Sequence, residues 1–321
     1  MPTPLAPLTT LRVGGPAAQV WTCSSQEELV DAVASHPSAF VLGGGSNVVL
    51  PDAGLPEVVL VRNRGISGLT IEAGEDWDSF VAWSLASGYV GLEALSGIPG
   101  TVGASPIQNI GAYGAEVASS VSSVRVWDAT LGSVVDLPAA VCGFAYRTSV
   151  FKGARRFVVL SVTFSLARGS LSAPVAYAEL AARLGVAQGC SAPASEVREA
   201  VLSLRAGKGM VLSPDDPDSV SVGSFFTNPL VAQAPPGAPC WPDSSGLVKV
   251  SAAWLIEQSG FPKGWGSGPV GLSSKHTLAL VNRGGATAAD VLAVARVVRA
   301  GVLDRFGIAL VNEPVIVGDS L

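Results

Sequence analysis

The stretch Gly97-Ile-Pro-Gly-Thr-Val-Gly-Ala-Ser-Pro-Ile-Gln-Asn-Ile-Gly-Ala-Tyr-Gly114 decides the fold of this chain. Five glycines and two prolines stand here among small residues, and that composition excludes a regular helix or strand. We expect an extended, loop-rich segment whose backbone can lie flat against a planar ligand. Close packing of neighbouring strands is an alternative explanation for the same glycines.

The first glycine stretch along the chain, Leu42-Gly-Gly-Gly-Ser-Asn47, lies between two apolar runs that predict strands at 39–42 and 48–50, and residues 97–114 form the second glycine stretch. Consecutive glycines expose backbone N–H groups, and such a loop can hold a diphosphate. A glycine-rich turn would explain this stretch equally well if it stood alone. Two such stretches in one chain favour a large phosphorylated cofactor. The Rossmann pattern G-x-G-x-x-G fails because residue 48 is valine, so we expect no Rossmann crevice.

Capping signals and apolar periodicity predict the elements around these stretches. The first expected helix begins at the S-x-x-E box Ser25–Glu28 and ends before Pro37. Further helices are expected at 76–87, 195–205, 251–259 and from Thr287 to Gly307. The expected strands lie within 58–73 and at 121–127, 134–137, 157–166, 308–311 and 315–317.

Composition excludes several classes of protein. The chain has 321 residues, enough for two or three domains, and its apolar runs are too short for a membrane span. A net charge of -5 without a basic run makes nucleic acid an unsuitable partner. Four scattered cysteines and two histidines offer few metal ligands, so we expect no metal. The N-terminus lacks the pattern of a secretory signal, which favours the cytoplasm.

Six motifs follow one another along nearly the whole chain: Gly43-Gly-Gly-Ser-Asn47, Gly97-Ile-Pro-Gly-Thr-Val-Gly-Ala104, Gln108-Asn-Ile-Gly-Ala-Tyr-Gly114, Tyr146-Arg-Thr-Ser-Val-Phe-Lys152, Gly223-Ser-Phe-Phe-Thr-Asn-Pro229 and Asn312-Glu-Pro314. Each motif is modest alone. Together, and in this order, they resemble the UDP-N-acetylenolpyruvoylglucosamine reductase family, in particular its subgroup with a tyrosine loop over the substrate.

The resemblance implies an α+β fold. It would consist of an FAD-binding domain of the vanillyl-alcohol-oxidase (PCMH) type, in two α+β subdomains, and a smaller α+β substrate-binding domain. Residues 1–210 would form the FAD-binding region, with subdomains of about 1–65 and 66–210. Residues 211–307 would form the substrate-binding domain, and C-terminal strands at 308–321 would carry Glu313.

The resemblance also implies the reaction, which is NADPH-dependent and FAD-mediated reduction of UDP-N-acetylenolpyruvoylglucosamine to UDP-N-acetylmuramate for peptidoglycan and the cell wall. We expect a monomer. FAD would be non-covalent, because Cys23 and His36 are the only cysteine or histidine residues before Gly114 and both lie outside the glycine stretches. The residues expected to bind FAD are those of the first three motifs: Gly43, Gly44, Gly45, Ser46, Asn47, Gly97, Ile98, Pro99, Gly100, Thr101, Gly103, Ala104, Gln108, Asn109, Gly111, Ala112, Tyr113 and Gly114.

Three residues are carried over as catalytic. The alternation around Tyr146 and Arg147 predicts a strand with Arg147 and Ser149 on one face, and a guanidinium fork suits a carboxylate. A structural arginine paired with an acid is the alternative. Ser224 resembles the family's proton donor, and neither histidine is predictably close to it. Glu313 resembles a residue that stabilises the developing enolate, although a surface turn would explain it equally well.

Four further residues are assigned to substrate. Lys208 is our candidate to stabilise the alkoxide left on Ser224. Tyr177 resembles the tyrosine of the covering loop, and Asn228 and Gln258 resemble amide side chains that hold diphosphate or carboxylate. Gln258 also fits the solvent-exposed side of a helix.

Two other functions remain open from sequence. A small-molecule oxidase or dehydrogenase of the same flavin fold would share the cofactor but not the substrate. A catalytically inactive sugar-nucleotide-binding protein would share the ligand. The joint presence of Arg147, Ser224 and Glu313 argues against the second, because binding alone does not require all three.

Overall fold

A computed structural model describes residues 1–243 and 245–321 of the chain. The described chain divides into two compact units, each with its own hydrophobic core. Unit 1 comprises Met1, Ala17–Gly45 and Pro56–Gly207, and unit 2 comprises Pro2–Pro16, Ser46–Leu55 and Lys208–Leu321. The assignment of FAD to residues 1–210 and of substrate to 211–307 stays a prediction, because a compact unit does not by itself identify the ligand that it binds.

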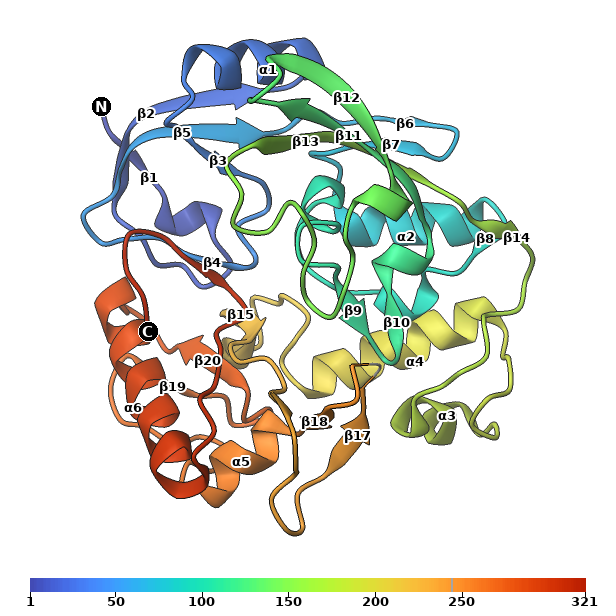
Figure 1. The fold of residues 1–321 in the computed structure, drawn as a ribbon, viewed down its shortest axis with the longest axis vertical. Coiled ribbons are helices and arrows are strands. Elements are labelled where there is room, and N and C mark those ends of the chain that lie inside the picture. The colour runs from blue at the N-terminus through green and yellow to red at the C-terminus, as the bar shows by residue number, and fades with distance from the viewer. Residues whose placement is uncertain (244) are drawn as a thin grey trace. The chain divides into compact units, whose positions relative to one another are not determined.

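Unit 1 contains four α-helices and most of the strands among the described residues (Figure 1). Its helices are α1 (Gln26–Ser35), α2 (Trp77–Ala86), α3 (Ala178–Leu184) and α4 (Ala194–Gly207). Its strands are β2 (Pro16–Cys23), β3 (Phe40–Leu42), β5 (Leu55–Val61), β6 (Ile66–Ser67), β7 (Thr70–Glu72), β8 (Tyr89–Val90), β9 (Gly111–Ala112), β10 (Ala115–Glu116), β11 (Val121–Asp128), β12 (Ser133–Pro138), β13 (Phe157–Phe164) and β14 (Ala167–Arg168).

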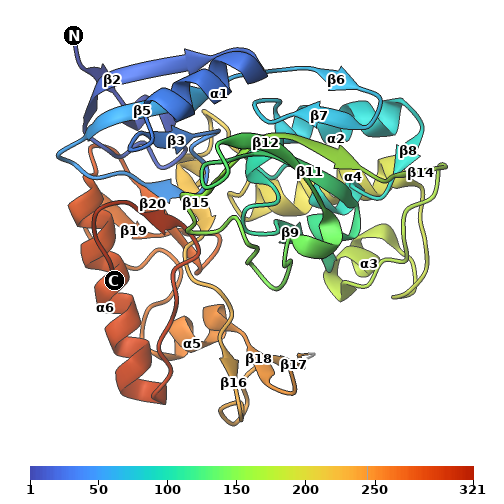
Figure 2. The same cartoon turned by 45° about the horizontal axis from the view of Figure 1, so that its top comes forward.

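Two sheets organise unit 1 (Figure 2). In the first, β2, β5 and β3 are neighbours in that order, and β3 runs parallel to β5. In the second, the order is β12-β11-β13-β7-β6, with antiparallel pairing throughout. The β3 strand ends directly before the first glycine stretch. The sheet therefore fixes the point from which that loop departs.

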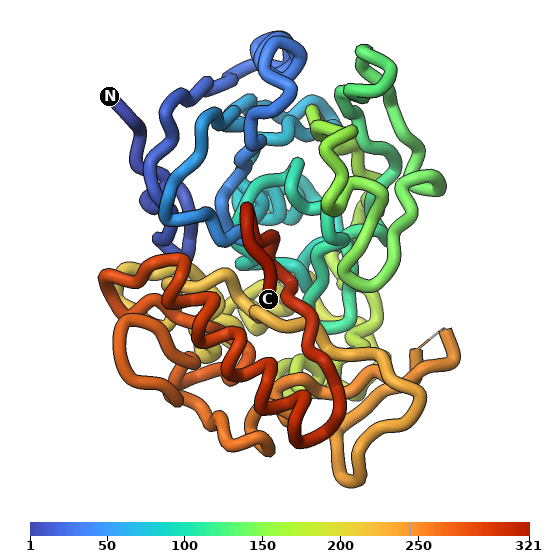
Figure 3. The backbone as a smooth tube through the Cα atoms, turned by 60° about the vertical axis from the view of Figure 1, so that its left-hand side comes forward, coloured from blue at the N-terminus to red at the C-terminus, as the bar shows by residue number. Residues whose placement is uncertain are grey.

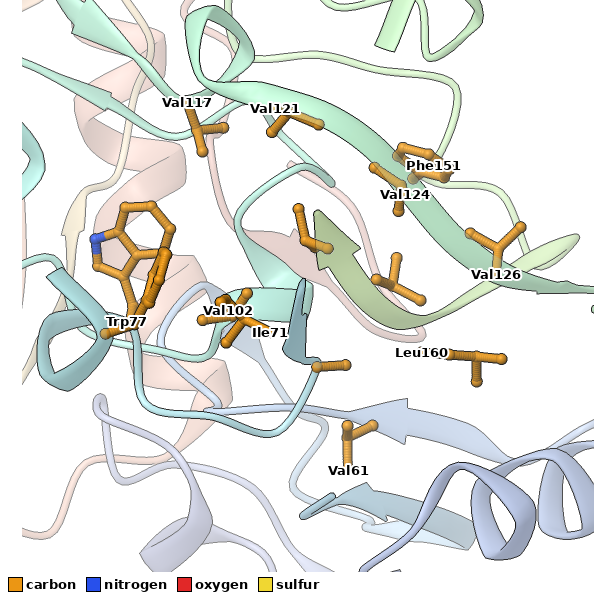
Figure 4. Close-up of a cluster of buried hydrophobic side chains, with 14 of the residues drawn as sticks. Val61, Ile71, Trp77, Val102, Val117, Val121, Val124, Val126, Phe151 and Leu160 are labelled. Carbon is orange, nitrogen blue, oxygen red and sulfur yellow. The ribbon is translucent and has the colours of Figure 1, made fainter. Parts of the chain in front are cut away.

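The core of unit 1 reaches into the second glycine stretch (Figure 4). Val102 is fully buried beside Ile71 of β7 and Trp77 of α2. The Trp77 indole N–H donates to the main-chain oxygen of Leu95 at 2.9 Å. An irregular segment is thus anchored by one apolar side chain in the core and by hydrogen bonds at its start.

Unit 2 has two α-helices among its described residues, α5 (Ala252–Gln258) and α6 (Ala288–Phe306). Its strands are β1 (Thr3–Pro4), β4 (Val48–Val49), β15 (Ser221–Ser224), β16 (Leu230–Val231), β17 (Cys240–Pro242), β18 (Val248–Val250), β19 (Val270–Leu272), β20 (Ala279–Asn282) and β21 (Val315–Ile316). A three-stranded antiparallel sheet in the order β15-β20-β19 forms its centre. In Figure 3 the chain that follows α6, drawn in dark red, turns back beside the helix.

Local signals explain the ends of the helices. Ser25 accepts from the N–H of Glu28 at the start of α1, as predicted. Thr287 and Asp290 form a reciprocal capping box at the start of α6, and Gly307 ends that helix with a left-handed φ of 66°. The predicted helices at 76–87, 195–205 and 251–259 are confirmed within a few residues. No described helix is long and apolar enough to cross a membrane.

The expected strand at 308–311 does not form. Leu310 is buried in the core of unit 2. Just after it, Asn312 forms an isolated β-bridge with Phe226. One bridge to the irregular segment at Phe226 provides too few main-chain hydrogen bonds to form a strand. The expected strand at 315–317 is confirmed as β21, which pairs in parallel with β4.

Candidate active site

In unit 1 the two glycine stretches pack directly against each other. A Cβ added to Gly44 would lie 2.7 Å from Cα of Gly100, and one added to Gly43 would lie 2.8 Å from Oγ1 of Thr101. Any side chain at these positions would push the stretches apart. Close packing therefore requires glycine at residues 43 and 44.

The glycine loop nevertheless keeps donors for a ligand. Within the described residues, the N–H groups of Gly43, Gly44 and Gly45 donate to no protein acceptor. Nη1 of Arg62 donates a hydrogen bond of 3.0 Å to the main-chain oxygen of Gly43. Burial, and then the nearby charge of Arg64, lower the pKa of the Arg62 guanidinium. Three adjacent N–H groups on a braced loop form the kind of anion site that a diphosphate occupies.

The second stretch is fixed at its start by neighbouring residues of α2. The N–H of Gly97 donates to Oδ1 of Asp78 at 2.6 Å, and the N–H of Trp77 donates to the oxygen of Gly100 at 3.1 Å. Gly103 has a packing function, because a Cβ there would lie 2.4 Å from Cβ of Ala73. The other predicted cofactor positions of this stretch are half-buried, namely Ile98, Pro99, Thr101, Ala104, Gln108 and Ala112.

Asp78 joins this stretch to α4. Its two carboxylate oxygens accept from Nη1 and Nη2 of Arg198 at 2.7 and 2.8 Å. Burial raises the pKa of Asp78, but the hydrogen bonds from Arg198 and Gly97 outweigh burial and hold that pKa below 3.8. Asp78 is therefore charged at neutral pH and links α2, α4 and the first residue of the glycine stretch.

Arg147 lies in a tight turn, not on the strand that the alternating pattern predicted. Ala145 and Thr148 exchange main-chain hydrogen bonds of 3.1 Å, and Arg147 has a left-handed φ of 53°. A non-glycine residue with positive φ cannot continue a pleated strand. The guanidinium instead reaches the glycine stretch, where Nη2 donates to the oxygen of Gly111 at 2.7 Å.

Two more contacts fix the turn of Arg147 to the glycine stretch. The Ser149 hydroxyl donates to the oxygen of Ile107 at 2.6 Å, and the Asn109 amide donates to the oxygen of Ala145 at 3.1 Å. Asn109 is buried, and its carbonyl accepts from the N–H of Ala118 at 3.0 Å. The side chain of Asn109 is therefore used in hydrogen bonds to Ala145 and Ala118. A contribution of Asn109 to cofactor binding would come from its main chain.

The end of the same stretch meets Tyr177. The rings of Tyr113 and Tyr177 pack edge to face with centroids 5.6 Å apart. Burial raises the pKa of Tyr113 to about 12, so this phenol is a hydrogen-bond donor at neutral pH. Tyr177 is 42% exposed. Unit 1 thus assembles the glycine stretches, Arg147 and Tyr177.

In unit 2 the motif around Ser224 combines a left-handed glycine with a buried pair of aromatic residues. Gly223 has a left-handed φ of 72°, and an irregularity in the β15–β20 register lies between Ser221 and Ser224. Phe225 and Phe226 are buried in the core of unit 2 with ring centroids 5.3 Å apart. The half-buried Ser224 is therefore held next to a fully buried pair of rings.

Glu313 lies beside this motif. Its N–H donates to the oxygen of Phe225 at 2.8 Å, while the N–H of Phe225 donates to the oxygen of Leu278 at 2.7 Å. The main chain of Phe225 is thus fixed from both sides. The oxygen of Glu313 also lies 3.4 Å from the donating amide nitrogen of Asn47, the half-buried residue that ends the first glycine motif.

His276 is a neighbour of Ser224 that the sequence did not reveal. Its Nε2 lies 3.4 Å from Oγ of Ser224, a contact that could not be predicted from the sequence. His276 belongs to the turn between β19 and β20, and it reaches Ser224 because β15 pairs with β20. The pairing of β15 with β20 joins segments that are far apart in the sequence. The residues next to Ser224 and His276 in the sequence therefore do not indicate their contact.

The substrate candidates of unit 2 lie in different surroundings. Oδ1 of Asn228 accepts from the N–H of Ala252 at 2.9 Å, so its NH2 group is the part suited to a ligand. Gln258 is exposed at the end of α5, as its alternative explanation required. Lys208 is half-buried, and Cε of Met210 lies 3.9 Å from where a Cβ of Gly223 would be. The segment after Lys208 therefore runs past the Ser224 motif.

Comparison with known proteins identifies two family models that match this chain. Residues 17–138 match the family model of an FAD binding domain, and residues 215–317 match that of the UDP-N-acetylenolpyruvoylglucosamine reductase C-terminal domain. The predicted fold class, an FAD-binding region followed by a smaller α+β domain, is confirmed.

Full-length relatives give the same result. The chain is 52% identical to the UDP-N-acetylenolpyruvoylglucosamine reductase of Thermobifida fusca, over 99% of this chain and 98% of the relative. It is 52% identical to the reductase of Mycolicibacterium gilvum, over 99% and 96% of the two chains. The crystal structure of the Thermus caldophilus reductase matches with a TM-score of 0.71 and 28% identity, over 98% of both chains. The chain therefore belongs to the UDP-N-acetylenolpyruvoylglucosamine reductase family.

Proposed function

We propose that this chain reduces UDP-N-acetylenolpyruvoylglucosamine to UDP-N-acetylmuramate, with NADPH as reductant and FAD as cofactor, as a step of peptidoglycan synthesis. Its full-length identity to reductases of this name supports the substrate, and its match to the FAD-binding domain model supports the cofactor. The observation that carries the proposal is the main-chain bond between Glu313 and Phe225, which brings Glu313 beside the Ser224 motif in unit 2.

The residues of unit 1 fit FAD. The three N–H groups of Gly43, Gly44 and Gly45 suit the diphosphate, and residues 97–114, most of which are half-buried, suit the flavin and its surroundings. Cys23 is buried, and His36 stacks on Trp21 with ring centroids 3.8 Å apart, so each is engaged elsewhere in unit 1. Bound FAD would supply two-electron transfer from NADPH to the vinyl carbon of the substrate.

Side chains of the protein would stabilise the negative charge on the substrate and supply the proton. Negative charge develops at the carbon beside the substrate carboxylate, where Arg147 and Glu313 would stabilise it. The hydroxyl of Ser224 would give its proton to that carbon, and Lys208 would stabilise the resulting alkoxide. Tyr177, Asn228 and Gln258 would hold the sugar nucleotide.

The experiment is a comparison of half-reactions in Ser224→Ala. NADPH should bleach the flavin as in the wild type, because Ser224 has no part in that step. Reoxidation by the enolpyruvyl substrate under anaerobic conditions should fall by about 10²–10⁴-fold, the usual contribution of a general acid. Ser245→Ala, an exposed serine of the same unit, is the control. A variant that is reoxidised at the wild-type rate would remove Ser224 from the mechanism.

Reoxidation by oxygen separates the proposal from a flavin oxidase. Wild-type enzyme should be reoxidised by the enolpyruvyl substrate in the absence of oxygen. An enzyme that responds only to oxygen would be an oxidase of the same fold. We further propose a cytoplasmic monomer, which light scattering on the purified protein and fractionation of cells would test.

A further inference from the structure

The turn that carries His276 is braced from several sides. The Asp218 carboxylate, which is buried, accepts both from the N–H of Ser274 at 3.1 Å and from its hydroxyl at 2.6 Å. The Ser273 hydroxyl accepts from the N–H of Lys275 at 3.0 Å and of His276 at 3.1 Å. The main chain of the turn is thus fixed by side chains on both sides of it.

Charged groups of neighbouring segments complete this brace. Lys275 makes an ion pair with Asp216 at 2.8 Å, and the hydroxyl of Thr277 donates to the carboxylate of Glu257 in α5. The N–H of Ala279 donates to the oxygen of His276 at 3.0 Å, which closes the turn at the start of β20. Such a network holds an imidazole in one place more firmly than a surface turn needs.

A serine that gives up its proton must regain one from water before the next turnover. Ser224 is half-buried, and the side chain at hydrogen-bond distance from its hydroxyl is His276. Imidazole exchanges protons readily near neutral pH, whereas an alcohol is a weak acid. His276 is also half-buried, so it combines contact with Ser224 and partial access to solvent.

We propose that His276 returns the proton to Ser224 after each reduction, and that Asp218 positions His276 for this transfer by holding its turn. The proposal rests on the proposed role of Ser224 as proton donor. His276 is the catalytic residue of the pair, because it touches the reacting hydroxyl. Asp218 is a positioning residue, because it acts through the turn.

The proton transfers balance without any further reagent. The O–H bond of Ser224 breaks as a C–H bond forms on the substrate carbon. The Nε2–H bond of the His276 imidazolium then breaks as the O–H bond of Ser224 re-forms. Neutral His276 recovers its proton from water. No electrons move in this relay, and the one proton consumed is the solvent proton that the reduction requires.

The first test is His276→Gln in the flavin-loaded enzyme. Bleaching by NADPH should stay within about twofold of the wild type, while kcat for substrate reduction should fall by about 10²-fold with little change in KM. His36→Gln is the matched control, since His36 contacts Trp21 and Glu57 within unit 1. Wild-type kcat in His276→Gln would overturn the relay, as would an equal loss in both half-reactions.

The second test is a double-mutant cycle. Asp218→Ala should lower kcat without abolishing NADPH bleaching, and Asp218→Asn, which keeps an acceptor for Ser274, should recover most of the loss. If Asp218 acts through His276, the double variant should be no slower than His276→Gln alone. Asp215→Ala, an exposed neighbour, is the control. Additive losses in the double variant would overturn the positioning role.

These outcomes separate the inference from the proposed function. If wild type reduces the substrate and Ser224→Ala does not, the proposed role of Ser224 stands whatever His276→Gln does. If Ser224→Ala is active, the proposed role of Ser224 as proton donor is wrong, and so is the proposed role of His276 in returning its proton. An unfolded Asp218→Ala would be seen in its lost flavin colour, and Ser274→Ala then tests the same brace, with the same fall in kcat expected and wild-type kcat contradicting it.

Discussion

At the scale of single residues, Gly111 shows how the glycine stretch serves chemistry. A Cβ there would lie 2.7 Å from Nη1 of Arg147 and 2.8 Å from the oxygen of Ala115. The main-chain oxygen of Gly111 accepts from the same guanidinium. The absence of a side chain at Gly111 therefore lets Arg147 lie against the stretch that is proposed to meet the flavin.

Gly111→Ala should displace the guanidinium of Arg147 and lower kcat by about 10²-fold, since small misplacements of a catalytic group are costly. The flavin should remain bound, because the glycine loop at Gly43 is untouched. Steady-state kinetics and the visible spectrum check both expectations. Gly207→Ala is the control, because a Cβ there meets nothing within 4 Å. Unchanged kcat in Gly111→Ala would show that Arg147 tolerates the shift or takes no part.

At the scale of elements, the pair of Asp78 and Arg198 connects α2 with α4 and fixes Gly97. Burial raises the pKa of the Asp78 carboxyl, but hydrogen bonds from Arg198 and Gly97 outweigh burial, so that the pKa in the folded state lies below its ordinary value. The stabilising effect of such a group is complete above its unfolded pKa and is lost as pH falls through its folded pKa.

Asp78→Asn should lower the free energy of unfolding by about 1.5–3 kcal/mol at pH 7, because hydrogen bonds to charged groups contribute that much. The difference between wild type and variant should shrink below about pH 4, since protonation of Asp78 removes the same charge. Urea unfolding at pH 7 and at pH 3 measures both. A difference that persists undiminished at pH 3 would mean that the charge of Asp78 contributes little.

The elements also show what sequence could predict. The helices α1, α2 and α6 begin at side-chain caps and have local signals, so their bounds were predictable. The turn at Arg147 was not, because its left-handed φ is imposed by contacts with the distant glycine stretch. The helix α3 was also missed. The contact of His276 with Ser224 depends on the pairing of β15 with β20, which no local pattern records.

At the scale of the whole molecule, FAD should act as a structural ligand. A ligand that binds only the folded state adds about 2.7 kcal/mol to stability at a hundred times its Kd. Removal of FAD should therefore lower the unfolding midpoint, and added FAD should restore it. Hydrogen exchange at Gly43, Gly44 and Gly45 should slow on FAD binding, because these N–H groups have no acceptor among the described protein residues. Exchange that is equally fast with FAD would exclude this loop from the diphosphate.

The central claim is that electrons pass from NADPH through this protein to an enolpyruvyl sugar nucleotide. The direct measurement follows the visible flavin band of the wild-type protein under anaerobic conditions, first with NADPH and then with UDP-N-acetylenolpyruvoylglucosamine. The account predicts that NADPH bleaches the band and that the sugar nucleotide restores it with formation of UDP-N-acetylmuramate. A bleached band that the sugar nucleotide leaves unchanged, while oxygen restores it, would contradict the account.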